Sequence, residues 1–188
     1  MSHFSTRLFV TSLLILWGIQ HSISQSYYYN ASAYYDDTYS QWNLSAVDTL
    51  EEELEEELFL KWPNRNDWTN WTWQTEEDVI YIEQKWKNKT DQWELRTTDA
   101  IVSMKIKWRN DATNWTIQDG DYTIQWRTAS NSDAGHWVLD HKEYGYFEMY
   151  NTYSGDPRDW VIIDECLLPN HIKQAMIFTV IKVVTPSR

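Results

Sequence analysis

Two acidic turns are the clearest places where this chain could hold a cation. The first is Asp119-Gly120-Asp121, and the second joins Asp156 to Arg158 and Asp159. Carboxylate oxygens are the ligands that Ca²⁺ prefers, but neither turn has the full ligand spacing of a calcium loop. Aspartate and glycine are also ordinary turn residues. We therefore predict no cofactor and no metal site, with weak Ca²⁺ binding at these turns as the alternative.

Residues able to catalyse reactions are present, but not in catalytic patterns. His136 and His141 are five positions apart on one predicted strand, which sends them to opposite faces and away from a shared metal. The chain has only five glycines. It contains no phosphate-cradling glycine loop, no Gly-x-Ser-x-Gly and no His-Glu-x-x-His. We predict no catalytic residue and no enzymatic activity.

Cys166 is the single cysteine of the chain, so no intramolecular disulfide can form. Small secreted domains usually contain an even set of disulfides, and this one must be held by its core instead. The neighbours Leu167 and Leu168 favour a buried thiol. The alternative is a disulfide-linked dimer through Cys166.

The N-terminal residues predict the compartment. Arg7 precedes an apolar run over residues 8–19, which is typical of a secretory signal peptide over residues 1–24. Other stretches are too short for the roughly 20 apolar residues of a membrane-spanning helix. The formal net charge of -12 disfavours nucleic acid, whose binding depends on Lys and Arg. We predict a secreted, extracellular protein with no membrane insertion and no nucleic-acid partner.

Five Asn-x-Ser/Thr sequons fit a secreted chain, because each can carry a solvent-facing glycan. The predicted glycosylation sites are Asn30, Asn43, Asn70, Asn88 and Asn114.

A tryptophan repeat organises the larger part of the chain. Successive spacings of 22, 22, 22 and 23 residues indicate one structural unit used repeatedly. Within each unit, apolar and polar residues alternate, which predicts β-hairpins. In Asn70-Trp71-Thr72 and Asn114-Trp115-Thr116, a solvent-facing asparagine sends the adjacent tryptophan inward. The predicted structural core is Trp71, Trp93, Trp115, Trp137 and Trp160.

These hairpins predict an all-β domain over residues 59–188. The expected fold is an antiparallel meander of about ten strands, closed into a barrel or folded as a sandwich, with a β-trefoil as the alternative. Residues 172–184 are apolar on both faces and are predicted to form a central strand. Ligand-binding residues stay unassigned, with the hairpin turns and Trp62, Trp68 and Trp73 as candidates.

Two segments precede this domain. Residues 25–45 are rich in tyrosine among polar residues and are predicted to form a disordered arm. In residues 46–58, Leu50, Leu54 and Leu58 recur every four positions among glutamates. Ser45 with Asp48 resembles a capping box, so a short acidic amphipathic helix is predicted there.

One family resemblance rests on Tyr27–Tyr39 and on two repeat motifs, Thr90–Leu95 and Asp156–Ile162. A tyrosine-rich acidic arm followed by hairpins with a polar residue before tryptophan resembles dermatopontin-type extracellular matrix proteins. The resemblance implies adhesion to collagen, proteoglycan or cell surfaces, or a lectin or shell-matrix role. That family is cysteine-rich, so its disulfides do not carry over.

These features favour a secreted, N-glycosylated structural or adhesive matrix protein without enzymatic activity. Its expected partners are matrix or cell-surface glycans and proteins. Two alternatives remain. One is a carbohydrate-binding lectin that uses aromatic stacking, and the other is a carrier barrel whose tryptophans line a cavity for a small apolar ligand.

Overall fold

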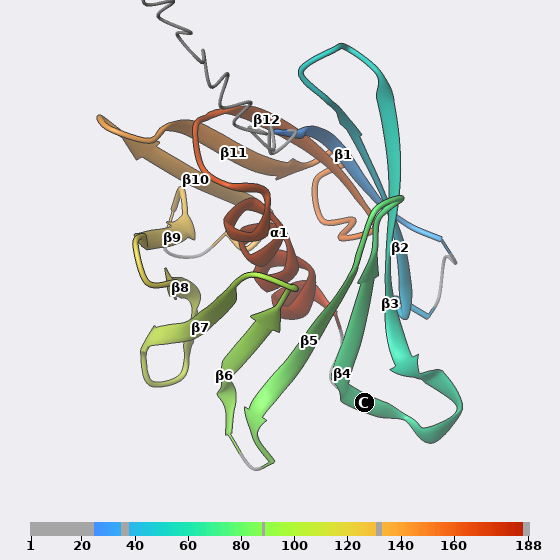
Figure 1. The fold of residues 1–188 in the computed structure, drawn as a ribbon. Helices are drawn as coiled ribbons and strands as arrows, with labels where there is room; N and C mark the ends of the chain where they lie inside the picture. Colours follow the sequence, from blue (N-terminus) through green and yellow to red (C-terminus); the bar gives the residue numbers. More distant parts are fainter. Residues whose placement is uncertain (1–24, 35–37, 88, 131–132, 186–188) are drawn as a thin grey trace, which may run out of the picture.

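A computed structural model describes residues 25–34, 38–87, 89–130 and 133–185, which form an antiparallel barrel closed around one helix (Figure 1). Each strand pairs with its neighbour in sequence, and β1 pairs with β12 to close the ring. The elements are β1 Tyr27–Ala33, β2 Gln41–Val47, β3 Glu53–Trp62, a 3₁₀ turn Pro63–Arg65, β4 Asp67–Gln74, β5 Val79–Trp86, β6 Lys89–Arg96, β7 Ile101–Trp108, β8 Asp111–Gln118, β9 Thr123–Thr128, β10 His136–His141, β11 Gly145–Asn151, β12 Asp159–Cys166 and α1 Asn170–Val184. The predicted hairpin meander is confirmed, as a barrel of twelve strands rather than ten.

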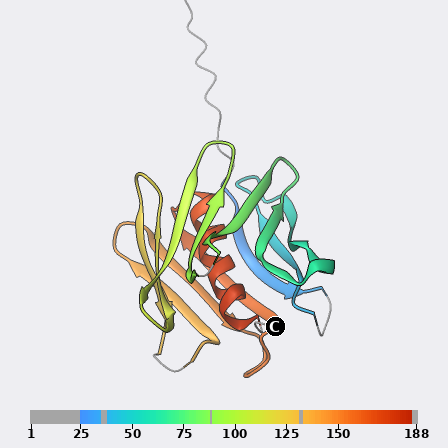
Figure 2. The ribbon, with the colours of Figure 1, turned by 90° about the horizontal axis from the view of Figure 1, so that it is seen from below.

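Helix α1 fills the interior of the barrel (Figure 2). All ten residues from Ile172 to Ile181 are buried. The Phe178 ring lies 6.0 Å from the ring of Trp71 and 5.2 Å from that of Trp93. The indole N–H of Trp126 donates to the carbonyl oxygen of Met176 at 3.1 Å. A helix surrounded by strands is buried on every side, so most of its residues are apolar; the exceptions among the buried residues are Lys173, Gln174 and Thr179.

The predicted central strand over residues 172–184 was therefore wrong. An apolar run without clear periodicity fits a buried helix as well as a buried strand. Its length favours the helix, because α1 has 15 residues and buried strands usually have four to eight.

The predicted disordered arm was also wrong, since residues 25–45 contain β1 and most of β2. Tyr28 is 1% exposed, and Ala31 pairs with Trp160 of β12. A tyrosine ring buries as much area as a large aliphatic side chain, so this polar-looking segment still supplies strands that bury their inner face.

The predicted acidic helix over residues 46–58 is instead the end of β2, a turn and the start of β3. The Asp48 carboxylate accepts hydrogen bonds from the backbone N–H groups of Leu50 (2.7 Å) and Glu52 (2.9 Å), so it caps a turn. A leucine spacing of four also satisfies the period of two of a strand. Leu58 accordingly faces inward, while Leu50 lies exposed in the turn.

Every even-numbered strand carries a buried tryptophan whose indole N–H donates to the backbone carbonyl three residues earlier. We call this hydrogen bond the indole pin. It occurs six times at the same end of the barrel, because each such tryptophan follows a β-hairpin turn at that end. The pairs are Trp42 with Tyr39 (3.1 Å), Trp71 with Trp68 (3.2 Å), Trp93 with Thr90 (3.0 Å), Trp115 with Ala112 (2.8 Å), Trp137 with Ala134 (2.8 Å) and Trp160 with Pro157 (2.9 Å).

All five tryptophans of the predicted core are buried, and Trp42 is a sixth member that the sequence analysis placed in the arm.

Four of the six hairpins also have an aspartate four residues before the tryptophan. Its carboxylate accepts the backbone N–H two residues further on, which shapes the turn. These bonds run from Thr69 to Asp67 (3.0 Å), Thr113 to Asp111 (3.1 Å), Gly135 to Asp133 (2.8 Å) and Arg158 to Asp156 (3.1 Å).

Candidate recognition surface at the hairpin tips

Three neighbouring hairpins, β3–β4, β5–β6 and β7–β8, share a four-residue pattern at their tips. The pattern is Lys-Trp-x-Asn, at residues 61–64, 85–88 and 107–110. The three tips project from the same end of the barrel (Figure 1). Asn88 itself lies outside the described residues.

The tryptophans of this pattern lie in solvent. Trp62, Trp86 and Trp108 are 42%, 54% and 61% exposed. By simple alternation along the strand, each of these tryptophans would point inward. The strand register, however, shifts between the tryptophan and the residue two positions before it. Such irregularities bend a strand and redirect its side chains. The bulge therefore carries each indole past the rim of the barrel.

Positive charge accompanies two of these rings. The Trp62 ring has Lys61 Nζ at 5.6 Å and the Arg65 guanidinium carbon at 4.9 Å. Lys107 Nζ lies 5.7 Å from the Trp108 ring. These distances are within the range of cation–π attraction, which holds each cation beside an aromatic face.

The three tips are basic although the whole chain is acidic. Residues 61–68, 85–91 and 107–111 contain seven Lys and Arg against three Asp, in a chain of net charge -12. The turns at the other end are acidic, as at residues 51–53 and 76–78. Lys85 is paired with Glu94, whose carboxylate oxygen lies 2.6 Å from Lys85 Nζ. We name the remaining basic, aromatic set the tip surface, defined by Trp62, Trp86, Trp108, Lys61, Arg65, Lys87, Lys89, Lys107 and Arg109.

The sequence analysis named the hairpin turns and Trp62 as candidates but missed the pattern that the three tips share, although its signal is present. Lys-Trp-x-Asn recurs after 24 and then 22 residues, in step with the buried repeat. Of the three candidate aromatics, Trp62 lies in the tip surface and Trp68 is half-buried against Trp71. Trp73 is fully buried. An overall net charge also conceals a local patch of the opposite sign.

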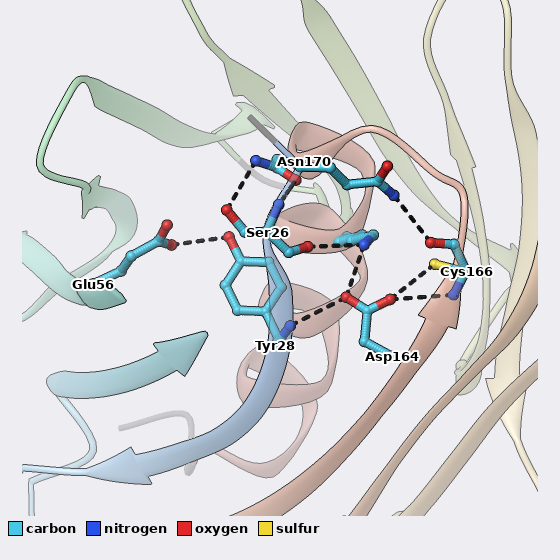
Figure 3. A network of polar contacts seen from close by, with 8 residues as sticks. Ser26, Tyr28, Glu56, Asp164, Cys166 and Asn170 are labelled. Carbon is cyan, nitrogen blue, oxygen red and sulfur yellow. Dashed lines mark hydrogen bonds and ion pairs between the residues drawn. The ribbon is translucent and has the colours of Figure 1, made fainter. Parts of the chain in front are cut away.

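A second group of polar side chains is buried where α1 begins (Figure 3). Lys173 Nζ lies 2.8 Å from Asp164 Oδ2 and donates to the carbonyl oxygen of Ser26 at 2.9 Å. The same carboxylate oxygen accepts the backbone N–H of Tyr28 at 3.1 Å. The backbone N–H of Ser26 donates to Asn170 Oδ1 at 2.9 Å. These contacts fasten the first turn of α1 to β1 and β12.

The buried carboxylate of Glu56 continues this group. It accepts the Tyr28 hydroxyl at 2.9 Å and the Trp73 indole N–H at 2.6 Å. Burial raises the pKa of Glu56, although these hydrogen bonds oppose the shift. Burial, followed by the nearby Glu56 charge, raises the pKa of Tyr28 well above its usual value. The group joins strands to helix in the core, so we interpret it as structural.

The two acidic turns use their oxygens within the protein. Asp119 Oδ1 accepts the backbone N–H groups of Asp121 and Tyr122 at 3.0 Å each, and Asp119 Oδ2 lies 2.7 Å from His171 Nε2. Asp156 Oδ2 lies 2.6 Å from the Arg158 guanidinium. Within the part of the chain that the structure describes, no three His, Cys, Asp or Glu residues gather as a metal site.

The remaining predicted sites lie apart from one another. Asn30, Asn43, Asn70 and Asn114 are partly exposed, on β1, β2, β4 and β8, so their glycosylation stays a prediction. The predicted signal peptide, residues 1–24, lies outside the described residues, as does Asn88.

Cys166 is fully buried at the end of β12. Burial, with the negative charge of Asp164 adding to it, raises the pKa of the Cys166 thiol to about 12. The thiolate is the form that attacks a disulfide, so the thiol is unreactive while β12 stays in place. A disulfide between two chains would first require this end of the barrel to open.

No family model matches the chain, and no curated protein or solved structure matches it either. The resemblance to dermatopontin-type proteins stays a prediction. Among the residues described, no helix combines the length and apolar character needed to cross a bilayer.

Proposed function

We propose that the protein is a secreted, non-enzymatic adhesion protein that attaches to the extracellular matrix or to cell surfaces through its tip surface. The observation that carries this proposal is the Lys-Trp-x-Asn pattern on three adjacent hairpins, with its tryptophans exposed. Trp and Arg are enriched among the residues that dominate binding interfaces.

The barrel supports such a role because it is a rigid platform. Its loops and hairpin tips are fastened by the six indole pins and the aspartate caps, and binding residues commonly lie on loops held by a rigid scaffold. The interior, which a carrier of small apolar ligands would need, is occupied by α1. Binding at the rim therefore agrees with this architecture better than transport inside it.

The test is retention of the full-length secreted protein on a cell-derived matrix. We expect wild-type protein to stay bound after washing and to be released by salt, because salt screens the basic tips. The variant Trp86→Ala/Trp108→Ala should pass into the medium. Matched controls are Tyr153→Ala, an exposed aromatic outside the tip surface, and Lys142→Ala, an exposed lysine at the opposite end.

Two outcomes would overturn this proposal. One is a wild-type protein that diffuses freely in the presence of matrix and cells. The other is equal retention of the wild-type protein and the double tryptophan variant.

A further inference from the structure

We infer that the tip surface binds an anionic polysaccharide, a chain of sugar rings that carries sulfate or carboxylate groups. This inference rests on the proposed function and names its ligand class. It combines three features of the tips: exposed aromatic faces on three adjacent hairpins, cations beside two of those faces, and exposed Lys or Arg side chains at all three tips.

The aromatic component suits sugar rings. The C–H-bearing face of a pyranose is apolar enough to stack on an indole, and Trp86 and Trp108 expose more than half of their surface. Neighbouring paired strands are about 4.8 Å apart, so equivalent positions on adjacent hairpins are separated by roughly 10 Å where the hairpins pair. The pairing ends at the pairs Asn70–Glu83 and Gln92–Lys105, so the tips beyond it are separated by at least roughly 10 Å, which is no less than the length of a disaccharide. One extended polysaccharide chain can therefore contact two or three tips at once.

The charged component selects an acidic sugar. Lys61 and Arg65 lie against the Trp62 ring, and Lys107 lies against the Trp108 ring. A ring stacked beside these tryptophans would place its sulfate or carboxylate within reach of the cation. Lys87 at the β5–β6 tip and Arg109 at the β7–β8 tip are exposed as well. A neutral sugar would leave this concentration of positive charge unused.

An anionic membrane is a weaker occupant. Surfaces that enter a bilayer combine tryptophan with exposed aliphatic side chains. On this chain the exposed aliphatic residues of the described part, Leu50, Ile101 and Leu167, are at the opposite end of the barrel. Anionic lipids also belong mainly to the cytoplasmic leaflet, which a secreted protein does not meet.

A second copy of the chain is the other competitor, because the acidic turns at one end could face the basic tips of another barrel. Such head-to-tail contacts would build open filaments rather than closed oligomers. The acidic turns supply charge but not a ring to stack on the three tryptophans. We therefore favour the polysaccharide and treat self-association as an outcome of the test.

The experiment is calorimetric titration of the full-length secreted protein, after enzymatic removal of its own N-glycans, with heparin, hyaluronate and neutral dextran. We expect binding to the two anionic polymers and none to dextran. Trp86→Ala and Trp108→Ala should each weaken binding roughly tenfold, as expected when a dominant contact residue is lost. Lys107→Ala/Arg109→Ala should weaken it and reduce its salt dependence. Tyr153→Ala and Lys142→Ala should bind like the wild-type protein.

Each contrary result has a definite meaning. Equal binding of dextran and heparin would refute the charge selection. If the lysine and arginine variant loses affinity but the tryptophan variants do not, the binding is nonspecific attraction of a polyanion and the stacking on tryptophan is refuted. Stronger binding to vesicles of phosphatidylserine and phosphatidylcholine would identify a lipid surface instead.

Two further measurements separate this inference from the proposed function. Concentration-dependent filaments in sedimentation, abolished by the tip variants, would identify a second copy as the occupant. Tip-dependent retention on a matrix whose polysaccharides have been digested would overturn the inference and leave the proposed adhesive function standing. A melting temperature unchanged by each substitution would show that these exposed positions do not support the fold.

Discussion

The buried ion pair between Lys173 and Asp164 predicts a large loss of stability when the lysine is removed. Lys173 is fully buried, and its ammonium group contacts Asp164, the Ser26 carbonyl and the Tyr27 ring. Lys173→Met leaves the carboxylate buried without its cation. Breaking a buried pair in this way costs about 3–5 kcal/mol. For a domain of this size, each kcal/mol lowers the melting temperature by about 2–4 °C, so we expect a fall of about 6–20 °C.

The assays are urea unfolding, which gives the free energy of unfolding, and thermal unfolding, which gives the melting temperature, both at neutral pH and followed by tryptophan fluorescence. The matched control is Lys182→Met on the same helix. Burial lowers the pKa of Lys182, and its ammonium lies 5.6 Å from the Trp93 ring. Methionine keeps most of that packing, so the control should change stability by less than about 1.5 kcal/mol.

The double variant Lys173→Met/Asp164→Asn should be more stable than Lys173→Met alone, because it removes the unpaired charge. If Lys173→Met costs no more than the Lys182 control, or if the effects of the two substitutions simply add, the pair does not hold α1 in the way described.

Three further predictions concern the core and the turns. Trp137→Phe removes the indole donor to the Ala134 carbonyl and should lower the free energy of unfolding by about 1–2 kcal/mol. Trp137→Ala also leaves a cavity and should lower it by about 3–5 kcal/mol. Equal losses for the two variants in urea unfolding would contradict a separate contribution from the indole hydrogen bond. Because burial raises the pKa of Glu56, its contribution to stability is full below the ordinary carboxyl pKa and is lost as pH rises through the raised folded value. Glu56→Gln should therefore gain stability relative to the wild-type protein as pH increases, and parallel pH profiles of the two proteins would contradict this. Asn110 has a φ of 66°, so Asn110→Gly should be tolerated while Asn110→Ala costs about 1 kcal/mol; equal melting temperatures would show that this turn is unstrained.

The Lys-Trp-x-Asn motif is visible in the sequence, but the exposure of its tryptophans is not. Simple alternation sends Trp108 to the same face as Met104 and Ile106, which is the inner face. The register shift before Trp108 reverses this outcome. Because a bulge depends on both strands of a hairpin and on its turn, the exposure of the tryptophan follows from the folded hairpin rather than from the strand sequence.

Residues 25–58 were predicted wrongly for a different reason. Residues 25–45 have few aliphatic residues, which predicted a disordered arm, and the leucine spacing over residues 46–58 predicted a helix. Tyr28 and Glu56 nevertheless point into the core, because each receives a partner there: the Tyr28 hydroxyl donates to Glu56, and Trp73 donates to the same oxygen. A buried polar group is tolerated when its hydrogen bonds are made, and the partners of Glu56 lie on other strands, 28 and 17 residues away.

The sequence by itself determined the hairpin period and the inward direction of the repeat tryptophans. These features depend on local interactions, such as the bond from Trp115 to the carbonyl three residues earlier and the cap from Asp111 two residues further on. The length of the apolar run at residues 172–184 favours a helix, but only the tertiary structure decided that this helix lies inside the barrel and that β1 closes the ring with β12. Those outcomes rest on contacts such as Lys173 with Ser26, which are 147 residues apart, and on burial from every side, which a linear pattern does not record.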